Sequence, residues 1–175
     1  MRTRIEIGES AFEQMRIDLR GDVEQAGFFL ADFDQPRRCF VLGEWISVPS
    51  AGFEIQSGYH VALTDALKAE VLGAATVGEQ GLVEVHSHLG ADSAGFSPTD
   101  IDGLREWVPQ VRWRLRGHPY AAMVWDETSF DALAWTQLGG FVEQVEKVVV
   151  VGGESITASA RTLAGLEKEA GDVAL

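Results

Sequence analysis

The sequence predicts an α/β (α+β) domain in which helices flank one central mixed β-sheet. The 175 residues suit a single compact domain and leave little room for a second. Hydrophobic residues make up 46% of the chain and charged residues 23%, which are values of a globular protein. Helical and strand patterns follow one another in mixed order, and this order favours helices packed against one sheet.

The first half of the chain alternates between short helical and strand patterns. Ser10 and Glu13 form a capping pattern at the start of a predicted helix that ends near Gly21. The predicted strands 27–33 and 39–48 are apolar or alternating runs separated by a turn. These elements supply the first part of the expected sheet and its first covering helix.

The second half continues with two helices and further strands. One helix is predicted over 63–75, and another over 97–108, where Ser97 and Pro98 form a typical helix start. A strand over 82–88 lies between them. The other predicted strands are 5–7, 53–56, 120–125, 130–136 and 142–151, and the alternation at 112–116 also suggests a strand. We assign residues 1–154 to the domain and 155–175 to a C-terminal tail with helical potential.

Net charge, cysteine content and hydropathy argue against several classes of protein. The net charge of -13 argues against a nucleic-acid partner, because such proteins usually carry a basic face. The single cysteine, Cys39, forms no internal disulfide and is expected to be a packed, inert thiol. We find no signal peptide and no apolar run long enough for a membrane span, so we expect no membrane partner and a cytoplasmic location.

A candidate metal site lies at the end of the strand over 82–88. His86 and His88 are two residues apart on this strand and therefore face the same side. Asp100, at the start of the next helix, offers a carboxylate as a third ligand. Two histidines, one carboxylate and an open position are a common catalytic zinc arrangement.

Each part of this pattern also has an ordinary explanation. A His-x-His pair at a strand end is more often no metal site. Ser97 and Asp100 fit the N-cap and N3 positions of an ordinary helix start. The two interpretations are compatible, because a capped helix start can also direct Asp100 at a metal.

The combination resembles the JAMM motif of the JAB/MPN metalloproteases. That motif is His-x-His, a short loop and Ser-x-x-Asp, with a glutamate upstream just before a strand of the type Glu-x-x-Gly-apolar-Leu. The chain has Glu24 in that place, followed by Gly27 and an apolar strand. The resemblance covers roughly residues 5–136 and implies a single JAB/MPN-like domain with zinc held by the three ligand residues. It implies that Glu24 is the general base and acid, and that Ser97 donates a hydrogen bond to water or a developing oxyanion.

The resemblance also implies a function. JAMM enzymes cleave peptide or isopeptide bonds after the C-terminal glycine of ubiquitin or ubiquitin-like proteins. We therefore expect a zinc-dependent isopeptidase or peptidase of a bacterial ubiquitin-like conjugation system, with antiviral defence as a setting. Its expected partners are a ubiquitin-like protein or its conjugates, and homologues of activating and conjugating enzymes. The chain departs from the family in having Leu89 where proline is usual, and eight residues rather than seven before Ser97.

Other residues and classes stay as alternatives. Asp102 is a reserve ligand candidate, although a helix-start charge is its simpler role. His60 and His118 are expected on the surface or in packing. A non-catalytic MPN scaffold, or a metallopeptidase acting on small peptides or metabolite conjugates, are the alternative functions. The motifs of zinc deaminases, His-Glu-x-x-His proteases and serine hydrolases are absent from the sequence.

Overall fold

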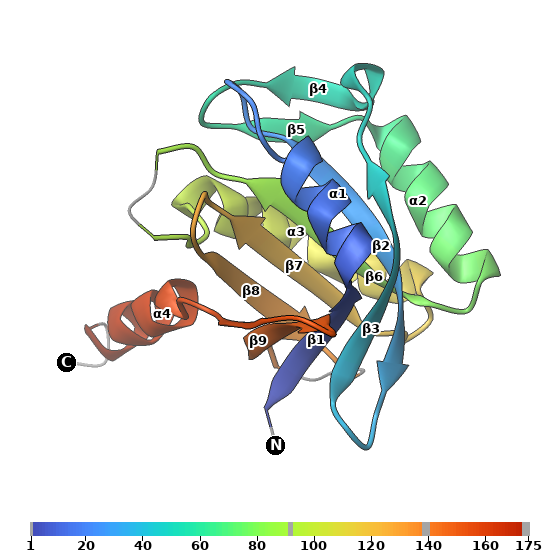
Figure 1. Ribbon diagram of the computed structural model, residues 1–175. Helices are drawn as coiled ribbons and strands as arrows, with labels where there is room; N and C mark the ends of the chain where they lie inside the picture. Colours follow the sequence, from blue (N-terminus) through green and yellow to red (C-terminus); the bar gives the residue numbers. More distant parts are fainter. Residues whose placement is uncertain (1, 91–92, 138–140, 173–175) are drawn as a thin grey trace.

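The fold combines one large sheet, a small hairpin and four α-helices in the part of the chain that is described. The computed structural model describes residues 2–90, 93–137 and 141–172 (Figure 1). The strands are β1 (Thr3–Gly8), β2 (Ala26–Asp34), β3 (Cys39–Ser47), β4 (Phe53–Gln56), β5 (Val61–Leu63), β6 (Gly81–Ser87), β7 (Tyr120–Trp125), β8 (Phe130–Trp135), β9 (Glu143–Val151) and β10 (Ser155–Thr157). The helices are α1 (Glu9–Asp18), α2 (Asp65–Val77), α3 (Pro98–Arg114) and α4 (Arg161–Asp172), with a 3-10 turn at Ser50–Gly52.

Seven strands of the large sheet close into a barrel. Their order is β1-β3-β2-β6-β7-β8-β9, and β1 also pairs with β9 in parallel, for example Ile5 with Val148. The predicted fold class, a central mixed sheet of JAB/MPN type flanked by helices, is therefore wrong. The sequence places the strands well but does not reveal that the first and last large strands pair, because that contact joins residues more than 140 positions apart.

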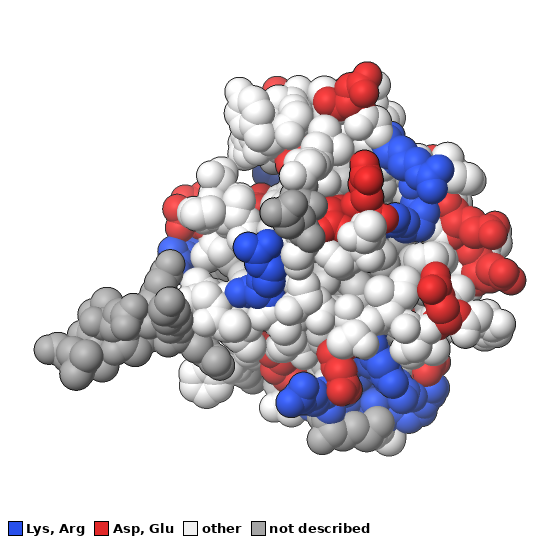
Figure 2. All heavy atoms as spheres, turned by 60° about the vertical axis from the view of Figure 1, so that its left-hand side comes forward, with Lys and Arg blue, Asp and Glu red and all other residues white. Residues whose placement is uncertain are grey.

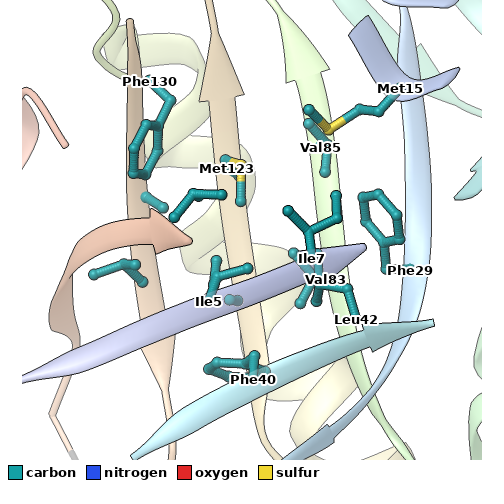
Figure 3. Packing of buried hydrophobic residues seen from close by; sticks show 14 of the residues in the cluster. Ile5, Ile7, Met15, Phe29, Phe40, Leu42, Val83, Val85, Met123 and Phe130 are labelled. Carbon is teal, nitrogen blue, oxygen red and sulfur yellow. The ribbon is translucent and has the colours of Figure 1, made fainter. Parts of the chain in front are cut away.

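The closed sheet explains why strands in the middle of the chain are apolar on both faces. Phe29, Val83 and Ala121 face the barrel interior, where they join a cluster that includes Ile5, Phe40 and Met123 (Figure 3). Their immediate neighbours face outward into a second cluster with α2 and α3, and these are Phe28, Leu82 and Tyr120. One apolar face is thus covered by helices and the other by the opposite wall of the barrel. The predicted fold class has helices on the sheet's faces, whereas here one apolar face of the strands is covered by the barrel itself.

Helices α2 and α3 form where the sequence provides caps and apolar faces. The cap predicted at Ser10 is wrong, because α1 follows β1 directly and begins at Glu9, with Gly8 as N-cap and no side-chain cap hydrogen bond. Thr64 caps α2 by accepting a hydrogen bond from the backbone N–H of Leu67 at 3.3 Å. In α3, Val108 and Val111 are buried against the outer face of the barrel. This helix continues through Pro109, so the strand expected at 112–116 is wrong. The alternation there covers only five residues, whereas the buried positions follow helical spacing.

The C-terminal tail is held against the barrel by regular structure. β10 pairs antiparallel with β9, and Ile156 packs against the interior cluster. α4 follows and extends away from the barrel (Figure 1). The end of the assigned tail, residues 173–175, lies outside the described residues.

The described surface carries both signs of charge. On the face shown in Figure 2, Lys and Arg side chains lie in separate groups with Asp and Glu side chains between them. None of the described helices has the length and apolarity that a membrane crossing requires.

Candidate metal centre

The two histidines lie at the end of β6 and point to one place. β6 lies between β2 and β7, and its strand pairing fixes His86 opposite Ala26 on β2 and Val124 on β7. His88 follows the strand, and its backbone N–H donates to the carbonyl of Trp125 at 2.7 Å. The two Nε2 atoms are 3.2 Å apart. The spacing of two residues thus brings both imidazoles to one point, as the sequence predicts.

Asp100 reaches the same point from the start of α3. One carboxylate oxygen, Oδ2, lies 3.1 Å from His88 Nε2, and the other, Oδ1, lies 3.6 Å from His86 Nε2. Ser97 is the N-cap of the helix and forms a capping box with Asp100. The Ser97 hydroxyl donates to Asp100 Oδ2 at 2.7 Å, and the Ser97 backbone N–H donates to the same oxygen at 2.7 Å. The cap therefore orients the carboxylate toward the histidines.

Glu24 approaches the histidines from the segment before β2. β2 and β6 are antiparallel with Ala26 opposite His86, so continuing the register by two residues brings Glu24 opposite His88. The Glu24 Oε1 atom lies 4.0 Å from His88 Nε2, and the residue is only 4% exposed. Its backbone is fixed by neighbours: the N–H donates to the Ser57 carbonyl at 2.8 Å, and the Gln56 amide donates to the Glu24 carbonyl at 3.1 Å.

Burial and the short distances between Glu24, the two histidines and Asp100 shift the pKa values of these groups. Burial raises the pKa of Glu24 above its usual range, although the nearby His88 and His86 oppose the shift. Burial would lower the pKa of His86, but the hydrogen bond and negative charge of Asp100 outweigh it and raise that pKa overall. Burial likewise opposes ionisation of Asp100, yet hydrogen bonds from His86 and His88 hold its pKa well below the usual range. Asp100 is therefore a carboxylate under ordinary conditions.

His86, His88 and Asp100 could hold a metal ion. One ligand atom from each lies within 4.8 Å of the others. Two imidazole nitrogens and a carboxylate oxygen are donors that suit zinc, and three protein ligands leave a position open. The two Nε2 atoms face each other at 3.2 Å, so both could turn a lone pair toward one ion when neither carries a proton.

A cavity of about 210 Å³ opens beside the ligands, between α3, the β4–β5 hairpin and β6. His86 and Asp100 line it. Three further lining residues, Glu84, Trp107 and His60, were not in the predicted site. His60 was predicted to lie on the surface or in packing. It lies between β4 and β5, and this hairpin brings it to the cavity. Glu84 could have been suggested by its spacing, since it is two residues before His86 on the same face of the strand.

The loop before Ser97 is tied to the C-terminal segment. The Phe96 backbone N–H donates to Thr162 Oγ1 at 2.9 Å, and that hydroxyl donates to buried Asp131 at 2.7 Å. Ser159 Oγ donates to the Ala94 carbonyl at 2.6 Å. The phenyl ring of Phe96 lies 5.8 Å from the His86 ring. The sequence pattern gave no sign that residues assigned to the tail support the loop of the candidate site.

The loop expected as a cleft wall, residues 89–96, is described only in part, because 91 and 92 lie outside the described residues. Gly90 adopts a φ of 65°, a backbone conformation that favours glycine.

The other suggested residues lie elsewhere. Asp102 is exposed on α3 and pairs with Arg105 at 2.8 Å, so it is not brought to the ligands. His118 lies in the turn before β7. Cys39 is fully buried in the barrel wall, as a packed thiol should be. The site therefore gathers Glu24 and the three ligand residues and leaves these three outside.

Comparisons with known proteins identify no family for the chain. No protein-family model matches it, and no curated protein does. Among solved structures it is similar to the solution structure of a protein from Desulfitobacterium hafniense, with 14% identity and a TM-score of 0.48, over 83% of this chain and 92% of that one. The JAB/MPN resemblance therefore depends on the motif residues alone.

Proposed function

We propose that the protein is a zinc-dependent hydrolase of peptide or isopeptide bonds. The observation that carries this proposal is the meeting of four groups from three parts of the chain. Glu24 precedes β2, His86 and His88 end β6, and Asp100 begins α3, yet their side chains lie within 4.0 Å of a neighbour in the group. His86 and Asp100 also line the cavity. Such a grouping of a ligand set with a nearby buried carboxylate is the arrangement that metal-assisted hydrolysis requires.

His86, His88 and Asp100 would hold the zinc ion. When bound in such a set, zinc polarises a carbonyl group and lowers the pKa of water. The protein's own contribution is to fix the ligands. Ser97 fixes Asp100 by donating a hydrogen bond to its carboxylate. The hydrogen bond from the His88 backbone N–H to the Trp125 carbonyl fixes the backbone of the second histidine.

Glu24 would transfer the protons. An amide is cleaved only when the nucleophile loses a proton and the leaving amine gains one. Burial raises the pKa of Glu24, which brings its proton affinity closer to that needed near neutral pH. Its position next to His88, at 4.0 Å, lets it act at the ligand set without being a ligand itself. The Ser97 hydroxyl would donate to a developing oxyanion only by turning its single hydrogen away from Asp100, to which it donates in the structure.

The proposed substrate is a ubiquitin-like protein, processed or removed from a target after its C-terminal glycine. The motif resemblance supports this choice. A glycine next to the scissile bond also has no side chain to collide with the ligands. In this proposal the chain works beside homologues of activating and conjugating enzymes in a bacterial system.

The test exchanges Glu24 for glutamine. Gln cannot accept the proton, so Glu24→Gln should keep the fold and bound zinc and lose about 100-fold or more of the hydrolysis of a ubiquitin-like fusion. Glu13→Gln, an exposed residue on α1, is the matched control and should keep full activity. If Glu24→Gln retains near wild-type turnover, Glu24 is not the base. If the wild type holds zinc but cleaves neither fusions nor peptides, a scaffold role replaces the proposal.

A further inference from the structure

Glu84 brings a carboxylate into the cavity next to the metal ligands. It lies on β6 two residues before His86, and both residues line the cavity. Side chains at i and i+2 on a strand share a face and are about 7 Å apart. The carboxylate of Glu84 therefore lies close enough to contact the same substrate as the ligand set, but it is not one of the ligands.

Only one of the two oxygens of this carboxylate has protein partners. Trp107 Nε1 donates to Oε2 at 3.0 Å, and the Tyr120 hydroxyl donates to the same oxygen at 2.9 Å. Among the residues that the structure describes, no donor reaches Oε1, and no Lys, Arg or His forms an ion pair with Glu84. The indole and phenol thus fix the carboxylate in place while its second oxygen stays available.

The one lysine that lines the cavity, Lys68, forms no ion pair with Glu84. Lys68 Nζ lies 3.7 Å from Asp65 and 5.4 Å from the centre of the Trp107 ring. The other polar groups of the wall are His60, Thr99 and the ligands His86 and Asp100. The remaining wall is mostly apolar, and includes Val61, Leu63, Phe96 and Leu104. The cavity therefore combines an apolar wall with one fixed carboxylate, whose Oε1 has no donor among the described residues.

We propose that this cavity binds a basic side chain of the substrate, a lysine or an arginine, through Glu84. Glu84 is half-buried and one of its oxygens has no donor among the described residues, and a cation satisfies a carboxylate better than a neutral group does. The long aliphatic stem of Lys or Arg matches the apolar wall and the charged end matches Oε1. The inference rests on the proposed function, because it names a specificity pocket for that hydrolysis.

The spacing places the basic residue near the scissile bond. A substrate bound in extended form advances about 3.3 Å per residue. The step of about 7 Å between Glu84 and His86 therefore corresponds to about two residues of substrate. We expect the basic side chain two to four positions from the bond that is cleaved.

The first experiment leaves the protein unchanged. Peptides with a fluorophore and a quencher carry arginine, lysine, glutamine, citrulline or norleucine at each position within four residues of the scissile bond. Citrulline is a neutral analogue of arginine, so it isolates the charge. We expect one position at which arginine or lysine gives about 10- to 100-fold higher kcat/KM than citrulline or norleucine. Equal cleavage of charged and neutral peptides at every position would overturn the proposal.

The second experiment changes the pocket. Glu84→Gln keeps an oxygen for Trp107 and Tyr120 but removes the charge, and it should reduce the preference for the basic peptide to about 3-fold or less. Glu70→Gln removes one charge from the exposed face of α2 and should leave the preference intact. A preference that persists in Glu84→Gln would exclude Glu84 as its source.

Binding measurements separate this inference from the proposed function. If the wild type cleaves no peptide, the proposed hydrolysis fails, and fluorescence anisotropy of the same peptides then tests the pocket alone. Tighter binding of the arginine peptide than the citrulline peptide by about 10-fold, lost in Glu84→Gln, would support the pocket. Equal binding of the two peptides would overturn it.

Discussion

Thr162 is expected to stabilise the fold and the candidate site through a single hydroxyl. Its Oγ1 accepts a hydrogen bond from the Phe96 N–H at 2.9 Å and donates one to Asp131 at 2.7 Å. Thr162 is 7% exposed and Asp131 is fully buried. Thr162→Val keeps the shape of the side chain but removes both bonds, leaving the Phe96 N–H without its partner.

The size of the effect follows from these contacts. A buried donor left without a partner costs about 1–3 kcal/mol. Asp131 keeps other donors, the Thr162 N–H at 2.9 Å and Gln144 Nε2 at 2.8 Å, so its share of the loss is small. We therefore expect Thr162→Val to lower the free energy of unfolding by about 2 kcal/mol. Thr162→Ser keeps the hydroxyl and should lose under about 1 kcal/mol, the value of one buried methyl group.

Urea denaturation followed by circular dichroism measures the free energy of unfolding of both variants. An unchanged m-value shows that the variants expose the same surface on unfolding as the wild type. Zinc affinity should also fall in Thr162→Val, because Phe96 packs near His86 and its loop leads directly to Ser97. A loss below about 0.5 kcal/mol in Thr162→Val, or an equal loss in both variants, would refute the reasoning that the hydroxyl anchors this loop.

Two further predictions concern single carboxylates. Asp100→Asn should weaken zinc affinity by about 10-fold or more while the fold persists, because an amide is a poorer ligand, and competition with a metal indicator measures it. Asp126→Ala should lower the free energy of unfolding by about 1–3 kcal/mol, because Asp126 Oδ1 accepts from the Thr128 N–H at 2.7 Å and Oδ2 from the Ser129 hydroxyl at 2.8 Å. Burial opposes ionisation of Asp126, but these bonds hold its pKa below the usual range. The difference in stability between wild type and Asp126→Ala should therefore be full above about pH 5 and shrink as the pH falls below about 4, whereas a pH-independent difference would contradict this origin.

Local elements were predictable because their signals are short-range. Ser97 with Pro98 and Asp100 specifies a capped helix start, and the structure confirms the cap and the capping box. The helix starting after Thr64 and the hairpin of β7 and β8 are confirmed in the same way. The convergence of His86 and His88 also follows from the sequence, because a separation of two residues on a strand fixes the common face.

Closure of the barrel was not predictable from these signals. The pairing of β1 with β9 leaves no local pattern, and strands apolar on both faces are equally compatible with helices on each side. The contact of Thr162 with Phe96 is long-range in the same sense. The β4–β5 hairpin is local, but its second strand was not among the predicted strands. The support of the site loop by the C-terminal segment and the place of His60 at the cavity therefore emerged only from the structure, whereas the face that Glu84 shares with His86 follows from their spacing.

The most direct test of the central claim is the zinc content of the purified full chain, measured by plasma mass spectrometry. One site built from His86, His88 and Asp100 predicts about one zinc per chain in the wild type. The double variant His86→Ala and His88→Ala should then contain almost none while keeping its circular dichroism spectrum. A wild type that binds no zinc when it is supplied, or a folded double variant with full occupancy, would contradict the account.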